Sequence, residues 1–307
     1  MLRAERRMIP AGRRCTVLIE VLDPREPMTA QHPSRAGRTI SGAAAAACAV
    51  LLVCATVRGQ TPAMGDFSGY PRIDHSEVLS KLARATPQAP ADFSSMNLSN
   101  LDLAGVDFKH ANLSAAVLNG ANLSGANLSG CNLTVSFAER ADLRNADLRG
   151  AVMFSTQLAG ADLRGADLTG ARFIGDLRHA DLRAARMEKL DGAADMKNQS
   201  MGLMRAVISS ADLSGADLRG ADLSRADLSF TSLAGANLHG ARIFGGDFSG
   251  TSLAHADLSG ADLRESKFID TDFSGADLSG ADLSGSVLRN VRGLDSAKRD
   301  GANGLPP

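Results

Sequence analysis

A five-residue phrase repeats through most of this chain and restricts the folds that are open to it. From residue 91 to residue 290 the pattern Ala-Asp/Asn-Leu-Ser/Arg-Gly recurs with few interruptions, and residues 121–125 and 126–130 both read Ala-Asn-Leu-Ser-Gly. One such unit is too small to bury its own apolar side chains. A fixed short period therefore predicts a solenoid, in which neighbouring units stack and share one core.

The five positions of the phrase have distinct expected roles. We call them, in order, the small position (Ala), the polar position (Asp or Asn), the centre (Leu or Phe), the following position (Ser or Arg) and the corner (Gly). In an extended segment the small position and the centre point to the same side, so both are expected to face the core while the polar and following positions face water. Glycine at the corner suits a left-handed backbone that turns the chain.

The odd period excludes two simpler architectures. A continuous flat strand alternates with period two, so its apolar face would flip at every unit of five, and no helical stripe has a period of five. A turn at each corner resets the alternation. The pattern therefore predicts short extended segments that are joined at corners.

The phrase resembles that of the pentapeptide-repeat family, and the resemblance covers residues 91–290. It implies an all-β fold, a right-handed quadrilateral parallel β-helix in which each pentad forms one face and four pentads form one coil of about 20 residues. Phe248 and Phe268 are 20 residues apart. They are expected to stack in successive coils, about 4.8 Å apart.

The segments that flank the array are expected to differ from it. Residues 60–90 are a linker with a short N-terminal capping helix, because Asp74 and Glu77 have the spacing of a capping box. The helix is expected to end near Ala85 and to cover the open end of the first coil. Residues 291–307 are expected to form a C-terminal tail that covers little of the other end and whose last residues are disordered.

The phrase is interrupted at two places. Residues 171–174 are one residue short, and at about residues 190–200 the phrase disappears. The longer break is interpreted either as a plain loop that bulges from one corner or as a recognition loop, because rigid scaffolds often carry their binding residues in such departures. Its candidate partner-binding residues are Met196 and Lys197.

The N-terminal region has a different composition. Residues 1–34 are rich in Arg and lack periodicity, and they are interpreted as a disordered extension or as an over-extended start ahead of Met28. Residues 35–59 hold an alanine-rich apolar stretch behind basic residues, which is typical of a signal peptide. The alternative is a membrane anchor at residues 40–57, although a membrane span needs about 20 apolar residues. In a bacterium the expected localisation is periplasmic or secreted, or alternatively membrane-anchored.

Charge patterning argues against direct nucleic-acid binding. The array from residue 91 to residue 290 holds 18 Lys and Arg and 25 Asp and Glu, so its net charge is 18 − 25 = −7. A nucleic-acid-binding stripe needs an excess of positive charge. Acidic polar positions and basic following positions are instead expected to form rows that neutralise one another, as with Asp142, Asp162 and Asp181 beside Arg144, Arg164 and Arg183.

Aromatic residues outside the core positions are candidates for recognition. An exposed aromatic side chain in an otherwise neutral surface often anchors a protein partner. The alternative for each is a local packing role. The four candidates are Phe137, Phe154, Phe230 and Phe244.

No motif in the sequence indicates catalysis. The glycines fall at corners, and the His and Cys residues lack the spacing of metal ligands. We therefore expect no enzyme activity, no cofactor, no metal and no small-molecule substrate. Cys131 occupies a small position and is expected to be a buried free thiol.

Two functions are considered. The first is a non-enzymatic scaffold, a rod for protein–protein interaction that acts on an unknown protein partner outside the cytoplasm and contacts the membrane only through an uncleaved N-terminal segment. The alternative comes from the family resemblance, because the family includes acidic rods that mimic DNA and bind a type II topoisomerase. The net negative charge of the array is compatible with the alternative, whereas the expected export signal opposes it. An enzyme with a site in the 190–200 loop is a third reading that no set of residues supports.

Overall fold

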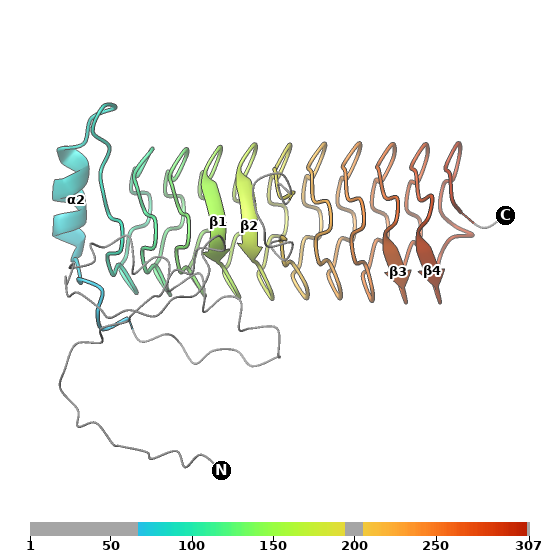
Figure 1. The fold of residues 1–307 in the computed structure, drawn as a ribbon, viewed down its shortest axis with the longest axis horizontal. Coiled ribbons are helices and arrows are strands. Elements are labelled where there is room, and N and C mark those ends of the chain that lie inside the picture. Colours follow the sequence, from blue (N-terminus) through green and yellow to red (C-terminus); the bar gives the residue numbers. More distant parts are fainter. Residues whose placement is uncertain (1–66, 194–204, 306–307) are drawn as a thin grey trace, which may run out of the picture. The chain divides into compact units, whose positions relative to one another are not determined.

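The computed structural model describes residues 67–193 and 205–305. All of them belong to one compact unit, Ile40–Pro307. In this unit the chain winds as a right-handed quadrilateral β-helix, which is the expected fold (Figure 1). Each coil has four faces, and each face is joined to the next coil by a parallel bridge between residues 20 apart, for example Asn97–Val117, Asp102–Asn122, Asp107–Asn127 and Asn112–Asn132.

Regular secondary structure is sparse because each face is only a few residues long. The described residues contain one helix, α2 (His75–Ala83), and four strands, β1 (Val152–Gln157), β2 (Arg172–Asp176), β3 (Lys267–Ile269) and β4 (Val287–Arg289). β1 pairs with β2, and β3 pairs with β4, in both cases parallel. These ladders connect successive coils, so the strands lie one above the other along the solenoid.

The backbone N–H groups of one pentad show how the coils are held together. In residues 141–145 the small position donates across the preceding corner at 3.2 Å, and the polar position donates to the preceding coil at 2.9 Å. The centre and the corner donate to the following coil at 2.7 and 3.0 Å. The fifth N–H, of Arg144, donates to Oδ1 of Asp142 at 3.1 Å. Each N–H thus has an acceptor, as buried backbone requires, and the polar side chain serves the one group that the backbone leaves unpaired.

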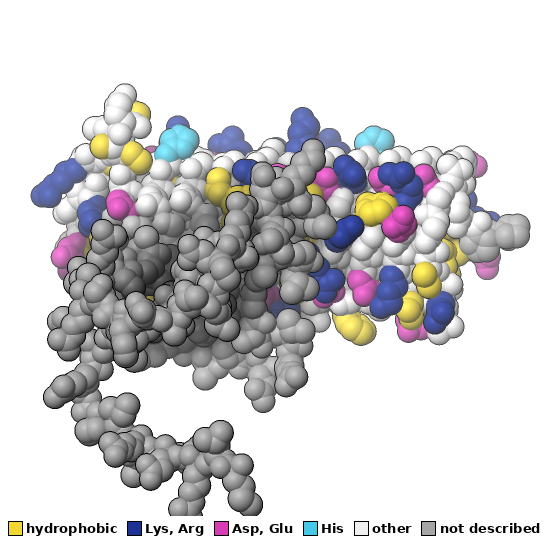
Figure 2. Space-filling model, viewed as in Figure 1, with side chains coloured by type: hydrophobic (Ala, Val, Ile, Leu, Met, Phe, Trp, Pro, Cys, Tyr) yellow, Lys and Arg dark blue, Asp and Glu magenta, His cyan; other side chains and the backbone are white. Residues whose placement is uncertain are grey.

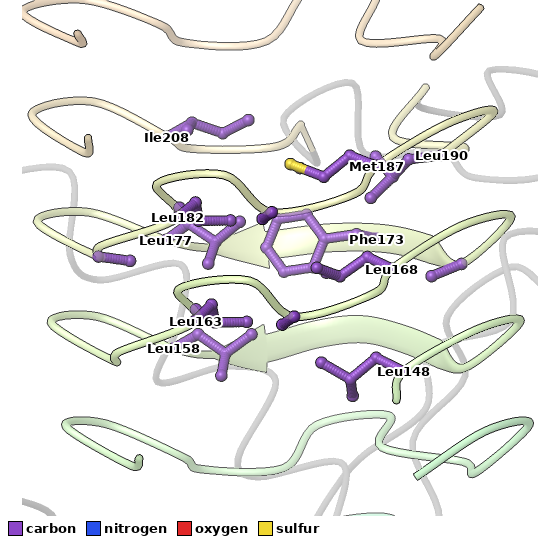
Figure 3. Packing of buried hydrophobic residues seen from close by; sticks show 14 of the residues in the cluster. Leu148, Leu158, Leu163, Leu168, Phe173, Leu177, Leu182, Met187, Leu190 and Ile208 are labelled. Atoms are coloured by element: carbon purple, nitrogen blue, oxygen red, sulfur yellow. The ribbon is translucent and has the colours of Figure 1, made fainter. Parts of the chain in front are cut away.

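Small positions and centres fill the core as predicted. Leu123 and Leu128 are each 1% exposed, and Ala121 is fully buried. Centres of successive coils lie in columns (Figure 3). Phe248 and Phe268 stack with ring centroids 4.9 Å apart and 15° between their planes, which confirms the expected column.

Polar residues at small positions are accommodated by a recurring hydrogen bond. The Thr231 hydroxyl donates to the carbonyl oxygen of Ile208, a centre in the preceding coil, at 3.1 Å. The Cys131 thiol is buried and donates in the same way to Phe108 O at 3.1 Å. Burial raises the pKa of this thiol to about 12. Cys131 is therefore an inert core residue at neutral pH.

Helix α2 begins with the expected capping box. The Asp74 carboxylate accepts the Glu77 N–H at 2.9 Å, and the Glu77 carboxylate accepts the Asp74 N–H at 3.1 Å. The helix ends at Ala83, slightly earlier than predicted. Val78 is fully buried in the core cluster, whereas Leu79 is 45% exposed. One side of the helix therefore closes the first coil.

Side chains of α2 also serve the open edge of the first coil. In the ladder the carbonyl group of a polar position accepts an N–H from the preceding coil, and the first coil has none before it. His75 Nδ1 donates instead to Asp102 O at 2.6 Å, and Lys81 Nζ donates to Asp92 O at 3.3 Å. The helix thus satisfies edge groups that would otherwise be open to pairing with another chain.

The short pentad at residues 171–174 has no corner. Bridge partners across this coil are 19 residues apart instead of 20. β2 runs through the missing corner, and β1 adapts with a bulge between Phe154 and Thr156. A Cβ on Gly175 would lie 2.3 Å from Thr156 O, so glycine is required here for close approach of two backbones and not for a positive φ.

The second break leaves the ladder intact. Asp191 and Val207 occupy successive polar positions that both form bridges. They are 16 residues apart where successive polar positions are normally five apart, so 16 − 5 = 11 residues are inserted, which equals the length of the stretch 194–204 outside the described residues. The insertion falls between Ala193, a following position, and Arg205, a corner.

The pentad with the insertion exchanges its large and small residues. Leu190 stands at the small position and is 1% exposed, while Gly192 stands at the centre. A Cβ on Gly192 would lie 2.8 Å from Leu223 Cδ2. Leu190 therefore supplies the core volume that a centre supplies elsewhere, beside Met187 in Figure 3.

The ladder runs past the expected boundary at Asn290. Arg292, Lys298 and Asn303 form parallel bridges to residues of the preceding coil. The segment expected to be a tail thus extends the solenoid to residue 303. The reason is that the ladder consists of backbone groups, so it continues where the phrase has ended. Its inward side chains, such as Leu294, are only half-buried because no further coil covers them.

The Leu218→Asp variant tests the core. Leu218 is fully buried, so the variant places an unpaired charge among apolar side chains and should lower the free energy of unfolding by more than about 4 kcal/mol or prevent folding. Ala234→Asp, at an outward following position, is the matched control and should change it by less than about 0.5 kcal/mol. Urea unfolding followed by circular dichroism measures both, and similar values for the two variants would contradict the fold.

Candidate functional site

Most polar positions of the solenoid are half-buried, although the sequence analysis expected them to face water. The Asp142 side chain is 27% exposed. Asp212 Oδ1 accepts the Ser214 N–H at 3.0 Å and the Ser214 hydroxyl at 2.6 Å. The main role of the Asp and Asn rows is therefore to stabilise the fold, because each side chain stabilises its own turn.

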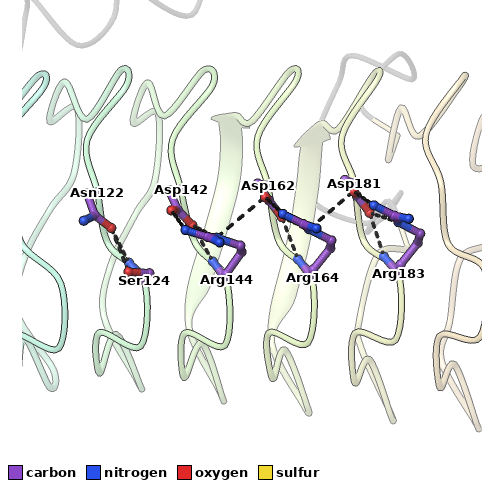
Figure 4. Close-up of polar contacts among 8 residues, drawn as sticks. All are labelled: Asn122, Ser124, Asp142, Arg144, Asp162, Arg164, Asp181 and Arg183. Atoms are coloured by element: carbon purple, nitrogen blue, oxygen red, sulfur yellow. Dashed lines mark hydrogen bonds and ion pairs between the residues drawn. The ribbon is translucent and has the colours of Figure 1, made fainter.

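Three successive coils carry Arg at the following position and form a continuous ion-pair row (Figure 4). Arg144 Nε donates to Asp142 Oδ1 at 2.8 Å, and Arg144 Nε also lies 3.7 Å from Asp162 Oδ2 in the next coil. Arg164 and Arg183 repeat the arrangement. The hydrogen bond from Arg144 holds the pKa of Asp142 below its ordinary value.

These rows neutralise one another, as the sequence predicted. In Figure 2 acidic and basic side chains are interspersed over the described part of the visible face. Exposed ion pairs of this kind contribute little to stability and are screened by salt. A partner that docked on such a row would have to break or desolvate existing pairs, so the rows are poor primary docking sites.

The four candidate aromatic residues have different environments in the structure. The Phe137 ring packs against Phe67, with centroids 5.0 Å apart. The Arg172 guanidinium lies 4.8 Å from the centroid of Phe154. Similarly, the Arg264 guanidinium lies 5.9 Å from the centroid of the Phe244 ring. All three aromatic residues are half-buried, and each has an intramolecular partner.

Phe230 differs from the other three because its side chain is 70% exposed. It stands at a corner with φ of 57°, where glycine is usual. Its ring lies over the next coil, since a Cβ on Gly250 would be 2.6 Å from Phe230 Cδ1. The ring is thus supported on one side and open to solvent on the other.

An uncharged stretch adjoins Phe230 on the face that carries the ion-pair row. Along this face the polar positions are acidic from residue 142 to residue 212 and acidic again at Asp272, but two coils between them carry serine. Their following positions are alanine. We call these four half-buried residues the neutral window: Ser232, Ala234, Ser252 and Ala254.

The neutral window also leaves backbone groups without an acceptor. Elsewhere the polar Asp or Asn accepts the N–H of the following position, as Asp212 does for Ser214. Serine is shorter, and the Ala234 and Ala254 N–H groups have no acceptor among residues 67–193 and 205–305. The window therefore presents outward hydrogen-bond donors beside an exposed aromatic ring.

The remaining sequence-based predictions concern the loop residues, a metal site and a membrane segment. Met196 and Lys197 lie outside the described residues. In the described ranges no group of three or more His, Cys, Asp or Glu side chains is placed to hold a metal ion. The same ranges contain no helix that is long and apolar enough to cross a membrane. The expected signal or anchor at residues 35–59 lies outside them.

A family model described as pentapeptide repeats matches the chain in eight copies, at residues 91–134, 138–170, 203–240, 211–250 and 247–285. The chain belongs to the pentapeptide-repeat family. This assignment confirms the resemblance that the five-residue phrase predicts. Among proteins with curated descriptions, none matches this pentapeptide-repeat protein.

Several solved structures resemble this pentapeptide-repeat protein. HetL from the cyanobacterium Nostoc sp. strain PCC 7120, which is involved in heterocyst differentiation regulation, is 30% identical over 75% of this chain and 96% of its own, with a TM-score of 0.30. A pentapeptide repeat protein from the Arabidopsis thaliana thylakoid lumen is 29% identical over 32% of this chain and 70% of its own, with a TM-score of 0.28. QnrB1, a plasmid-mediated fluoroquinolone resistance protein, is 19% identical over 67% of this chain and 88% of its own, with a TM-score of 0.35.

Sequence reasoning missed the neutral window, although the signal was present. Ser232 and Ser252 read as ordinary members of the phrase when pentads are taken in chain order. Their significance appears only when residues 20 apart are aligned, because this shows two serines inside a column of Asp. The outward backbone donors follow from the same alignment.

The acidic rows of this pentapeptide-repeat protein predict acid sensitivity. Hydrogen bonds from Arg or Ser lower the pKa of Asp142, Asp217 and Asp277 from their ordinary value of 3.8, for Asp277 to about 2. The folded state therefore holds these protons less tightly than the unfolded state. The resulting stability is present above about pH 4 and is lost as the pH falls through the folded-state pKa values. The melting temperature should be flat from about pH 8 to pH 5 and fall steeply below pH 4.

The control replaces Asp by Asn, which keeps the acceptor for the turn and does not titrate, as Asn122 does naturally. In a variant with Asn at five ion-paired polar positions, the melting temperature should decrease less between pH 5 and pH 2 than it does in the parent protein. An equal loss in both would show that these carboxylates are not the cause. The five positions are Asp142, Asp162, Asp181, Asp217 and Asp262.

Proposed function

We propose that this pentapeptide-repeat protein is a non-enzymatic scaffold that binds a protein partner through Phe230 and the neutral window. The observation that carries the proposal is the 70% exposure of Phe230 beside a stretch without charge, on a face whose adjoining coils carry Asp212 and Asp272. The cores of protein–protein interfaces are depleted in charged residues and enriched in aromatic ones. The rest of the face, with its internally paired charges, forms a rim.

The energetics favour this surface over the ion-pair rows. Removal of an exposed Phe side chain from water contributes about 1.5–3 kcal/mol. The ring rests on Gly250, so little side-chain freedom remains to be lost when a partner binds. Docking on the neutral window also breaks no ion pair, because Ser232 and Ala234 carry none.

The surface defines the chemistry of its partner. The partner presents an apolar pocket for the Phe230 ring and oxygen acceptors for the N–H groups of Ala234 and Ala254. Asp212 and Asp272 stand on either side of the window along the solenoid, so basic residues at the edge of the partner's patch would complement them. These features describe a folded protein surface better than a small molecule, since the window spans two successive coils.

Phe230→Gly tests the proposal without loss of fold. Glycine is the usual corner residue and adopts the positive φ of this site without strain. The melting temperature should stay equal or rise, while affinity for the partner should fall by at least about 10-fold, as for an aromatic hot spot. Affinity capture from the native host, followed by titration of the captured protein, measures the loss.

Arg225→Gly is the matched control, because Arg225 is also a corner residue with positive φ and is exposed. It should keep partner binding. The double variant Ser232→Asp and Ser252→Asp restores the acidic column and supplies acceptors for both N–H groups, so it should fold normally and lose binding. Retained binding in Phe230→Gly and in the double variant would refute the proposed surface.

The alternative function, an acidic DNA-mimicking rod that binds a type II topoisomerase, draws support from the array's net charge of 18 − 25 = −7. Against it, many carboxylates are bound by Arg or Ser side chains and by backbone N–H groups. The Ser232→Asp and Ser252→Asp variant separates the two functions. Two further acidic groups should strengthen binding by a DNA mimic, whereas they should abolish binding through the neutral window.

The proposed site of action is outside the cytoplasm, either periplasmic or secreted, with a membrane anchor at residues 40–57 as the alternative. The support is the basic flank and apolar stretch within residues 35–59. We expect the mature protein from the native host to begin between Thr56 and Gln60, as measured by mass spectrometry of its N-terminal peptide. A soluble protein that retains Ala43 to Val57 would contradict export, without bearing on the Phe230 surface.

A further inference from the structure

The column of corners that contains Phe230 carries a large side chain in every second coil. Each corner N–H in this column donates to a following position of the next coil, as Phe230 N–H does to Ser249 O at 2.7 Å, so the corners lie in register along the solenoid. No other column alternates over such a length in the described residues. We call the larger members the corner row: Asn100, Arg140, His179, Phe230 and Asp270, with Gly120, Gly160, Ser210 and Gly250 between them.

The alternation has a steric cause. The side chain of a corner residue lies over the next corner of its column, where a Cβ would meet it. A Cβ on Gly120 would be 2.6 Å from Asn100 Oδ1, and a Cβ on Gly250 would be 2.6 Å from Phe230 Cδ1. The corner row therefore presents one exposed side chain for every two coils of the solenoid.

The spacing of the corner row matches one kind of chain conformation. Two coil steps of about 4.8 Å place successive side chains of the row about 9.6 Å apart. In a polyproline II helix, with three residues per turn, residues on one side recur about every 9.3 Å. The corresponding spacings are about 10.5 Å for seven residues of an α-helix and about 6.8 Å for two residues of a β-strand. A polyproline II helix therefore stays in register with the row over the greatest length.

We propose that the corner row binds an extended segment of the protein partner in the polyproline II conformation. The inference rests on the proposed function, because it includes Phe230 and names the part of the partner that docks there. A polyproline II backbone makes no internal hydrogen bonds, so its carbonyl groups are available to the Ala234 and Ala254 N–H groups of the neutral window. Such a segment is already ordered before it binds, and aromatic surfaces are the usual docking sites for it.

The charges of the corner row define the charges of the segment. Arg140 and Asp270 form no ion pair with another described residue, whereas Arg144 is paired with its own Asp. Six coil steps separate Arg140 from Asp270, which is about 29 Å and equals about nine residues of polyproline II. The segment is therefore expected to carry an acidic residue opposite Arg140 and a basic residue nine positions away. Phe230 lies opposite the sixth position, where a small side chain leaves room for the ring.

Synthetic peptides and the full chain test the inference by isothermal titration calorimetry. The probe is Glu-Pro-Pro-Ala-Pro-Pro-Ala-Pro-Pro-Lys, used together with its reversed sequence because a polyproline II segment can dock in either direction. At least one of the two should bind the parent protein. A peptide with Gly and Ser in place of Pro keeps both charges but has to be ordered on binding, so it should bind at least about 10-fold more weakly.

Glycine substitutions at corners assign peptide binding to the row. Phe230→Gly should weaken it by at least about 10-fold, and Arg140→Gly and Asp270→Gly by about 2- to 5-fold each, as for exposed ion pairs. Lys189→Gly and Glu265→Gly are the matched controls. They remove the same charges from corners of other columns that also have positive φ, and they should leave binding unchanged. Circular dichroism verifies the fold of each variant.

The outcomes separate this inference from the proposed function. If neither proline peptide binds, or if the Gly-Ser peptide binds equally well, the polyproline II segment is refuted, while loss of the native partner in Phe230→Gly still supports the proposed surface. If Arg140→Gly and Asp270→Gly bind the peptide as well as the parent does, the corner row is refuted as the docking site. If Phe230→Gly loses the peptide but keeps the native partner, the proposed function and this inference both fail.

Discussion

The fold of this protein depends on a ladder of backbone hydrogen bonds that joins each coil to the next one. Each pentad supplies five N–H groups, and only four of them find backbone acceptors, across a corner or in a neighbouring coil. Where the polar position is Asp or Asn, its side chain usually satisfies the fifth N–H of the same pentad, as Asp142 does for Arg144. This explains why Asp and Asn dominate the polar position whatever the charge of their surroundings. The core adds apolar burial, but the ladder decides which residue stands above which.

The ladder tolerates changes in chain length as long as bridge partners still meet. One coil lacks a corner, and Gly175 permits the resulting close approach of two backbones. Another coil carries 11 inserted residues between Ala193 and Arg205, yet the bridges on both sides persist. The core tolerates an exchange of large and small residues at Leu190 and Gly192 within one pentad. The pairing register between successive coils therefore stays the same along the solenoid, whereas the number of residues per coil varies.

The sequence predicted the features that repeat and missed those that depend on neighbours 20 residues apart. The β-helix, the stacked pair Phe248 and Phe268 and the capping box of α2 follow from local patterns. The half-burial of Phe137, Phe154 and Phe244 did not, because each is covered by a residue distant in the chain. The extension of the ladder beyond Asn290 was missed for a different reason, since backbone pairing leaves no side-chain pattern to read.

The same constraint indicates where a repetitive surface acquires specificity. A polar position that is Asp or Asn closes its own turn, and an Arg at the following position pairs with the Asp, so a regular pentad has few unsatisfied groups to offer a partner. Replacement of the polar residue by Ser removes the charge and also frees an outward N–H, as at Ala234 and Ala254. A corner that carries Phe instead of Gly adds an exposed ring to the same place. These changes lie together beside Phe230, and each departs from what the ladder or the turn requires locally. Fold stability does not explain them, which is why we propose them as the features that a partner recognises.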